Sequence, residues 1–208
     1  MGRYTGPACR RCRREGMKLF LKGNRCYTAK CAVEQGRPVP GAHGQRGSKM
    51  TDYGLQLREK QRLRRFYGLQ EGQFRNLFEQ AARRKGMTGE ALLQLLEMRL
   101  DNLVYRLGFA TSRRAARQFV TQGHVSVNGR RATVPSMLMK QGVRIEAGTH
   151  PKSREFAKLA LEATEGRGLS PWLTLDKENL KGEVLHVPSR EEIAPFVKEQ
   201  LVVELYSK

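Results

Sequence analysis

The spacing of apolar residues changes part-way along this chain of 208 residues, and the change limits the folds that it can adopt. Between residues 51 and 108 apolar side chains recur every three or four positions, which is the period of a helix with one buried face. From residue 124 onward short segments alternate between apolar and polar residues, which is the period of a β-strand. The order predicts an α+β fold in which helices come first and a small antiparallel sheet follows.

Three helices are expected in the first part of the chain. One, capped by Thr51 or Asp52, runs to about Tyr67, and a second ends before Gly86. A third begins near Thr88 and keeps leucines on one side as far as Gly108. Ser112 then caps a short helix, and residues 152–165 form another whose apolar face carries Phe156, Leu159, Ala160 and Ala163.

The expected strands lie on either side of that last helix. Asn128-Gly129 predicts a tight hairpin within residues 124–134, and a further strand contains Val143 and Ile145. Ser189 and Glu192 form a capping box for a short helix near the C-terminus. The remaining strands are expected at residues 172–175, 183–187 and 201–206.

The chain carries a large excess of positive charge. It has 39 Lys and Arg against 20 Asp and Glu, a formal net charge of +19. Residues 1–65 have a net charge of +13 and residues 66–168 of +8, whereas residues 169–208 have −2. Positive charges in such excess repel one another in a compact chain, so the charge indicates a polyanionic partner. Its uneven distribution indicates that the N-terminal half faces that partner.

Nucleic acid is the best candidate for that partner. No apolar run approaches the roughly 20 residues that span a bilayer, and the N-terminus lacks the apolar core of a signal peptide. We therefore expect no membrane partner and a cytoplasmic location.

The four cysteines, Cys9, Cys12, Cys26 and Cys31, all lie near the N-terminus with the spacing C-x2-C-x13-C-x4-C. Four thiolates at this spacing predict one structural Zn²⁺ per chain, with no open coordination position for catalysis. An iron–sulfur cluster and free thiols are the alternatives, and His43 could replace one ligand. Nine basic residues and one acidic residue within residues 1–31 would offset the charge of a zinc tetrathiolate.

Residues 111–131 form the clearest candidate RNA-binding surface. A helix end that attracts phosphate through its free N–H groups would carry Arg113, Arg114, Arg117 and Gln118. The following hairpin would present further polar groups beside it, and a merely solvated basic surface is the alternative. The predicted RNA-binding residues outside the helix are His124, Asn128, Arg130 and Arg131, then Arg58, Lys60, Arg62, Arg64 and Arg65, and finally Arg10, Arg11, Arg13 and Arg14.

No catalytic arrangement is recognisable in the sequence. The four histidines are scattered, and neither a phosphate-binding loop nor a nucleophile elbow is present. The chain is therefore expected to act on no small-molecule substrate and not to be an enzyme.

Long motifs resemble the family of bacterial small ribosomal subunit protein four, the uS4 family. They are RYTGPACRRCRREG, GAHGQRGSKMTDYGLQLREKQRLRRFYG and LEMRLDNLVYRLGFATSRRAARQFVTQGHVSVNG, followed by PWLTLD and QLVVELYSK. The resemblance covers essentially the whole chain, and the four cysteines resemble those of the metal-bearing form of the family.

The resemblance implies a structural protein of the small ribosomal subunit. Such a protein is a primary binder that nucleates assembly of the 5′ domain of 16S rRNA, lines the mRNA entry channel with small-subunit proteins three and five, and contributes to translational accuracy. Many members also repress their own mRNA. Arg46 and Lys49 lie where the family carries basic residues that face mRNA.

Three parts of the chain are expected on these grounds. Residues 1–50, with a Pro- and Gly-rich loop at 36–47, form a largely irregular, metal-bound extension. Residues 51–98 form a helical domain with which residues 188–208 can pack. Residues 99–187 form an RNA-binding domain whose sheet packs on helices, with a helix–hairpin module at 99–165.

Two rival functions remain. An enzyme that carries this module as an appendage would need a separate catalytic domain, for which the chain leaves no room. A DNA-binding regulator could use residues 113–122 as a recognition helix, but no helix-turn-helix dimer pattern accompanies it.

Overall fold

The computed structural model describes residues 4–42, 44, 50–193 and 197–207. The chain divides into two compact units, the first formed by residues 1–92 with 194–208 and the second by residues 93–193. The boundary falls within helix α4 (Thr88–Glu97). Along the described residues, none of the helices combines the length and the apolar character needed to cross a membrane.

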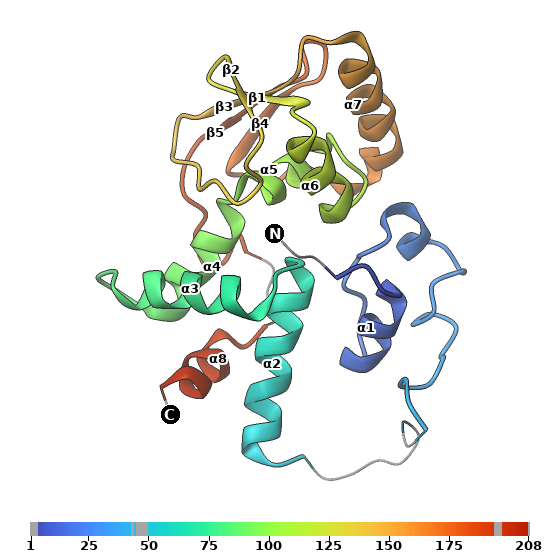
Figure 1. Cartoon of the computed structure of the whole chain (residues 1–208), viewed down its shortest axis with the longest axis vertical. Helices are drawn as coiled ribbons and strands as arrows, with labels where there is room; N and C mark the ends of the chain where they lie inside the picture. The colour runs from blue at the N-terminus through green and yellow to red at the C-terminus, as the bar shows by residue number, and fades with distance from the viewer. Residues whose placement is uncertain (1–3, 43, 45–49, 194–196, 208) are drawn as a thin grey trace. The chain divides into compact units, whose positions relative to one another are not determined.

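The first unit is helical (Figure 1). Thr51 Oγ1 accepts a hydrogen bond from the backbone N–H of Gly54 and caps the second of its α-helices, as its sequence predicts. Besides the start of α4, its helices are α1 (Ala8–Glu15), the 3-10 helix η1 (Gly23–Tyr27), α2 (Asp52–Phe66), α3 (Glu71–Ala82) and α8 (Glu199–Tyr206).

The N-terminal extension is largely irregular, as predicted, but it contains the two short helices α1 and η1. Leu19, in the segment between these helices, is fully buried. The sequence of α1 shows no ordinary apolar stripe because its buried residues are Cys12 and Glu15, one a thiol and the other a carboxylate. The helix ends at Gly16, whose left-handed conformation is typical of a helix C-terminus.

Helix α8 corrects the prediction of a strand over residues 201–206. The β-branched run in this segment favours a strand locally, but the segment packs along α2 as a helix. Val202 is fully buried, and the Tyr206 ring stacks on Phe78 with 4.5 Å between centroids. Packing against a helical unit therefore overrides local propensity.

The second unit is an α+β structure, so the predicted fold class is confirmed (Figure 1). Its five strands form one antiparallel sheet in the order β2-β1-β3-β5-β4. The strands are β1 (Val125–Val127), β2 (Arg130–Ala132), β3 (Arg144–Ala147), β4 (Leu173–Asp176) and β5 (Lys181–Val184), and the helices are α5 (Leu100–Arg106), α6 (Arg113–Thr121), α7 (Pro151–Thr164) and the 3-10 helix η2 (Glu165–Arg167).

The expected single helix from Thr88 to Gly108 is broken into α4 and α5. Arg99, between them, has extended backbone and forms an isolated bridge with Leu138. The next backbone N–H groups, of Leu100 and Asp101, donate to carbonyls of residues 135–137 rather than to the preceding turn. The leucine period continues through the break because both helices face apolar surroundings, so the sequence does not reveal it.

The predicted hairpin is present between β1 and β2. Asn128 and Gly129 both have positive φ, as a two-residue type I′ turn requires. Val127 pairs with Arg130 across the turn, and the β1 strand pairs with β3 on its other side. The strongest local signal in the sequence is therefore reproduced in the structure.

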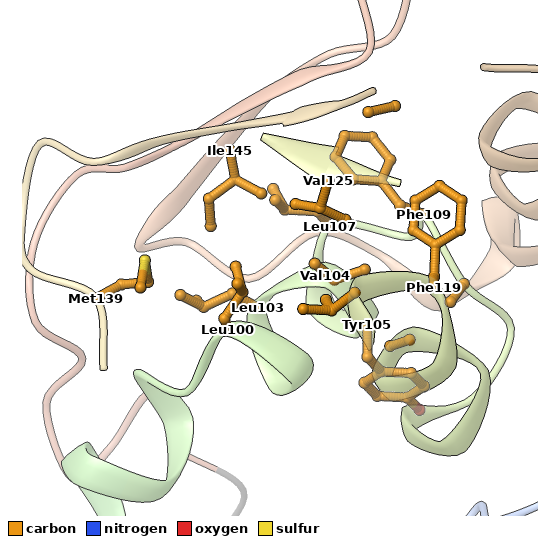
Figure 2. Close-up of a cluster of buried hydrophobic side chains, with 14 of the residues drawn as sticks. Leu100, Leu103, Val104, Tyr105, Leu107, Phe109, Phe119, Val125, Met139 and Ile145 are labelled. Carbon is orange, nitrogen blue, oxygen red and sulfur yellow. The ribbon is translucent and has the colours of Figure 1, made fainter. Parts of the chain in front are cut away.

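The core of the second unit lies between α5, α6 and the sheet. Figure 2 shows side chains of α5 pointing toward Val125 and Ile145 of the sheet, with Phe119 of α6 beside them. Trp172, the single tryptophan of the chain, is also buried in this core. The fully buried aliphatic residues that α5 contributes are Leu100, Leu103 and Val104.

The apolar face predicted for the helix at residues 152–165 is only partly correct. Helix α7 buries Ala157 and Ala160, but Phe156 is 43% exposed and Leu159 58% exposed. Ala163 is also exposed. The residues of α7 that are buried are all small: Ser153, Ala157 and Ala160.

The capping box predicted near the C-terminus forms only in part. The backbone N–H of Ser189 donates to Glu192 at 2.8 Å. No helix follows within residues 189–193, which form a turn and a bend.

Gly182 provides a test of the packing between α5 and the sheet. A Cβ at this position would lie 2.4 Å from a terminal methyl of the buried Leu107. We expect Gly182→Ala to lower the free energy of unfolding by about 1–3 kcal/mol through overpacking. The free energy of unfolding is measured by urea denaturation, with Trp172 fluorescence as the signal. Gly166→Ala is the control because nothing lies within 4 Å of its Cβ, and an equal loss there would contradict the packing explanation.

Candidate nucleic-acid interface and cysteine cluster

Helix α6 is held by its apolar side and offers polar groups on the opposite side. The hydroxyl of Ser112 accepts from the N–H of Ala115 at 3.2 Å and caps the helix, as predicted. Ala116, Phe119 and Val120 are buried in the core. The polar residues left on the exposed side are Arg114, Gln118 and Thr121.

The three predicted arginines of α6 differ in environment. Arg113 is buried: its Nε donates to Asn102 at 2.8 Å, and its guanidinium lies 4.4 Å from the centre of the Tyr105 ring. Arg117 is half-buried and pairs with Asp101 at 3.2 Å. Of the three, only Arg114 is exposed, so the structure gives Arg113 and Arg117 internal partners.

Asp101 is the centre of a buried ion-pair cluster beneath α6. Arg99, only 2% exposed, donates two hydrogen bonds to its carboxylate, at 2.7 and 3.0 Å. Arg117 binds the same carboxylate from α6. Because a buried charge is stable only when paired and hydrogen-bonded, this carboxylate fixes α6 relative to α5.

Glu97, at the end of α4, forms a second such centre. Its carboxylate is fully buried, accepts from Asn102 at 2.6 Å, and takes two hydrogen bonds from Arg106 at 2.6 and 3.0 Å. Asn102 in turn accepts from Arg113. Both carboxylates are linked to α6 by an arginine of that helix: Asp101 directly by Arg117, and Glu97 through Asn102 by Arg113.

Tyr105 joins this cluster to the segment after α7. Arg113 lies over its ring at 4.4 Å, and Arg167 lies 4.1 Å from the ring centre. Arg167 also donates to the carbonyls of Tyr105 and Thr111. Several arginines of the second unit thus serve packing and position rather than exposure.

The β1–β2 hairpin contributes two exposed arginines. Arg131 donates to the carbonyls of Gln122 and Gly123 at 3.1 and 3.2 Å, which ties the hairpin to the end of α6. Arg130 is exposed beside it. The amide oxygen of Asn128 accepts from the N–H of Arg144, so this side chain stabilises the turn.

Two adjoining hollows lie beside α6 and share Gln122, His124 and Ser153. One, of about 360 Å³, opens between α6 and α7, and the other, of about 410 Å³, is bordered by Arg131. The first also includes Lys152, which was not predicted. The sequence carries no signal for it, because the two helices that form the hollow are distant in sequence.

The predicted basic face of α2, in the first unit, is largely ion-paired within the protein. Arg58 and Arg65 both bind the buried carboxylate of Glu15. Lys60 is buried and pairs with Glu71 at 2.6 Å. The other two cations of the set, Arg62 and Arg64, bind Glu59 and Gln61 respectively.

The arginines of α1 are only partly engaged. Arg11 lies over the ring of Tyr4 at 3.5 Å, and Arg13 donates to the carbonyl of Pro38 at 2.9 Å. Arg10 and Arg14 are exposed. Burial, followed by the charge of Arg65, lowers the pKa of Arg11. Arg11 therefore lies close enough to Arg65 to be affected by its charge.

The four cysteines line one small cavity formed by α1, η1 and the following turn. The backbone N–H of Lys22 donates to Cys26 Sγ at 3.3 Å, and burial raises the pKa of Cys12 and of Cys26. Within the described ranges, however, no set of three or more His, Cys, Asp or Glu residues is arranged to hold a metal ion. The structure thus gathers the predicted ligands without showing a formed metal site. His43, Arg46 and Lys49 lie outside the described residues.

Two family models match the chain. Residues 3–97 match the ribosomal protein S4/S9 N-terminal domain, and residues 98–145 match the S4 domain. The helical unit and the α+β unit with its basic helix and hairpin therefore define a ribosomal protein with an RNA-binding S4 domain.

Curated relatives make the assignment more specific. The small ribosomal subunit proteins uS4 of Thermus thermophilus, Geotalea daltonii and Ruminiclostridium cellulolyticum are 56%, 57% and 55% identical to it, and each match covers all of both chains. The chain belongs to the uS4 family, a family of ribosomal proteins and not of enzymes.

The role of Asp101 can be tested by removing its carboxylate. Asp101→Ala leaves Arg99 buried without its partner, so we expect the free energy of unfolding to fall by about 3–5 kcal/mol. The measurement is urea denaturation followed by Trp172 fluorescence. In the control, Lys177→Ala breaks an exposed pair with Glu165 in the same unit and should change stability by less than about 1 kcal/mol. Comparable losses in the two variants would show that the buried cluster has no special role.

Proposed function

We propose that this protein is a structural component of the small ribosomal subunit that binds ribosomal RNA and holds it in a fixed arrangement. The observation that carries the proposal is the surface of α6 and the β1–β2 hairpin, which carries exposed arginines. A buried ion pair fixes α6, and hydrogen bonds from Arg131 tie the hairpin to the end of α6. Preorganised cations bind phosphate without the entropic cost of ordering them on contact. Membership of the uS4 family supports the same role.

The residues of this surface divide into two roles in the proposal. Arg114, Gln118 and Arg130 contact RNA directly, because they are exposed. Arg113 and Arg117 act as positioning residues, because each already binds a partner within the protein. Structured RNA is the favoured partner over duplex DNA, since A-form helices and junctions are recognised by shape and phosphate.

We further infer the finer roles that family resemblance implies. These are nucleation of the 16S rRNA 5′ domain, a contribution to the mRNA entry channel and to translational accuracy beside small-subunit proteins three and five, and repression of the chain's own mRNA. The exposed arginines Arg10 and Arg14 of the first unit support contact with nucleic acid there.

We also propose that the four cysteines bind one structural Zn²⁺. The support is chemical: the four cysteines line one cavity, and thiolates are ligands that zinc prefers. The ion would hold the extension in shape and take no part in catalysis.

The RNA-binding role predicts a strong dependence on salt. If about 8 phosphates are neutralised, the log–log slope of affinity for a 16S 5′-domain transcript is on the order of −6 to −7. Changing Arg114 and Arg130 together to Ala should make the slope less steep by roughly 1–2, as measured by filter binding across salt concentrations. Lys177→Ala, a change at an exposed cation on another element, should leave the slope unchanged. A flat salt response, or equal affinity for duplex DNA of the same charge, contradicts the proposal.

The zinc proposal predicts one zinc per chain in metal analysis of the purified protein. Changing Cys12 and Cys26 to Ser should abolish the metal, because both thiols line the cavity. Asn24→Ala, an exposed change in the same segment, should retain it. Iron with visible absorbance would identify a cluster instead, and protein free of metal after purification without chelators would reject both.

A further inference from the structure

The hollow between α6 and α7 has walls suited to a flat ring. Phe119 and Phe156 stack with their centroids 5.0 Å apart and an interplanar angle of 24°. Phe119 is buried and fixed by the core, whereas Phe156 presents 43% of its surface to solvent. An exposed phenylalanine at the edge of a hollow contributes nothing to the core on its outer side, but it offers a face on which another ring can stack.

His124 extends this aromatic wall. Its ring lies 5.2 Å from that of Phe119, and its Nδ1 is 2.8 Å from the hydroxyl of Ser153. Ser153 is itself buried, so the orientation of the imidazole is fixed. The hollow is therefore built from side chains that are already in place.

Polar groups surround the aromatic wall. Gln118 on α6 and Gln122, the residue that caps its C-terminus, line the hollow, and both are exposed. Each amide can donate and accept hydrogen bonds at the edge of a base. The volume of about 360 Å³ lies within the roughly 300–1,000 Å³ of sites that bind small ring compounds.

The charges around the hollow favour a nucleotide over an uncharged ring compound. Lys152 lines this hollow and Arg131 lines the adjoining one, and neither lining includes a carboxylate. Arg114 is exposed on α6, the helix that carries Gln118. A ring that enters the hollow would therefore have cations nearby to bind the phosphates attached to it.

We propose that this hollow binds one unpaired base of the RNA, stacked on Phe156, while the surrounding cations hold the flanking phosphates. This inference rests on the proposed function and adds to it that the protein selects RNA with an unstacked nucleotide. A paired base cannot enter, because its faces are covered and its edge is engaged within the A-form helix. Bulges and helix junctions supply such nucleotides.

Two short RNA stems test the proposal with the full chain. They are identical except that one has a single unpaired 2-aminopurine and the other pairs that position. We expect the unpaired stem to bind roughly tenfold more tightly, the size of one base stacked on an aromatic side chain. Fluorescence anisotropy measures both affinities, and quenching of the 2-aminopurine reports stacking.

The variants are chosen to separate stacking from charge. Phe156→Ala should abolish both the preference and the quenching while leaving affinity for the paired stem within about twofold, and Phe156→Tyr should restore them. Leu159→Ala is the matched control, since Leu159 is exposed on the next turn of α7 but does not line the hollow. Circular dichroism verifies that each variant is folded.

The possible outcomes keep the two proposals distinct. Equal binding of both stems by the unaltered protein, or an equal loss on both stems in Phe156→Ala, overturns the base-binding site. In either case the proposed function stands if binding is salt-dependent and weakened by Arg114→Ala on both stems. Binding that responds to neither salt nor Arg114 overturns the proposed function itself.

Discussion

Buried carboxylates determine where the arginines of the second unit can be. Glu97 and Asp101 are both buried, and a buried carboxylate needs a charged, hydrogen-bonded partner to be stable there. Arg106 meets this need at Glu97, while Arg99 and Arg117 meet it at Asp101. Because Arg117 belongs to α6, satisfying the carboxylate also sets the orientation of the helix. The exposed Arg114 is therefore positioned before any RNA arrives.

The sequence predicts those features of the fold that depend on neighbouring residues, and it does not predict those that depend on contacts between distant residues. The caps at Thr51 and Ser112 and the Asn128-Gly129 turn are local, so the helices that they start and the hairpin were predictable. The break between α4 and α5 depends on hydrogen bonds to residues 135–137, which no local pattern encodes. The helical state of α8 likewise depends on packing along α2, against the preference of its own β-branched residues.

The same limit applies to the candidate site. Arg113 and Arg114 are adjacent in the sequence and chemically identical, yet one is buried against Tyr105 and the other is exposed. Helix geometry separates them by about 100°, and only the position of the core decides which side each faces. Lys152 and Phe156 join the surface from α7 for the same reason: they become neighbours of α6 only when the unit folds.

In the first unit, too, a buried carboxylate is paired with arginines. Glu15 alone binds both Arg58 and Arg65, and burial lowers the pKa of Arg58 while further arginines act in the same direction. Glu59 and Glu71 pair with other cations of α2, but Arg10 and Arg14 of α1 remain exposed, and repulsion among such cations disfavours the free protein. In the proposed complex, RNA phosphates offset that repulsion, so the charge that weakens the isolated chain strengthens the complex. By linkage, binding must then stabilise the folded first unit.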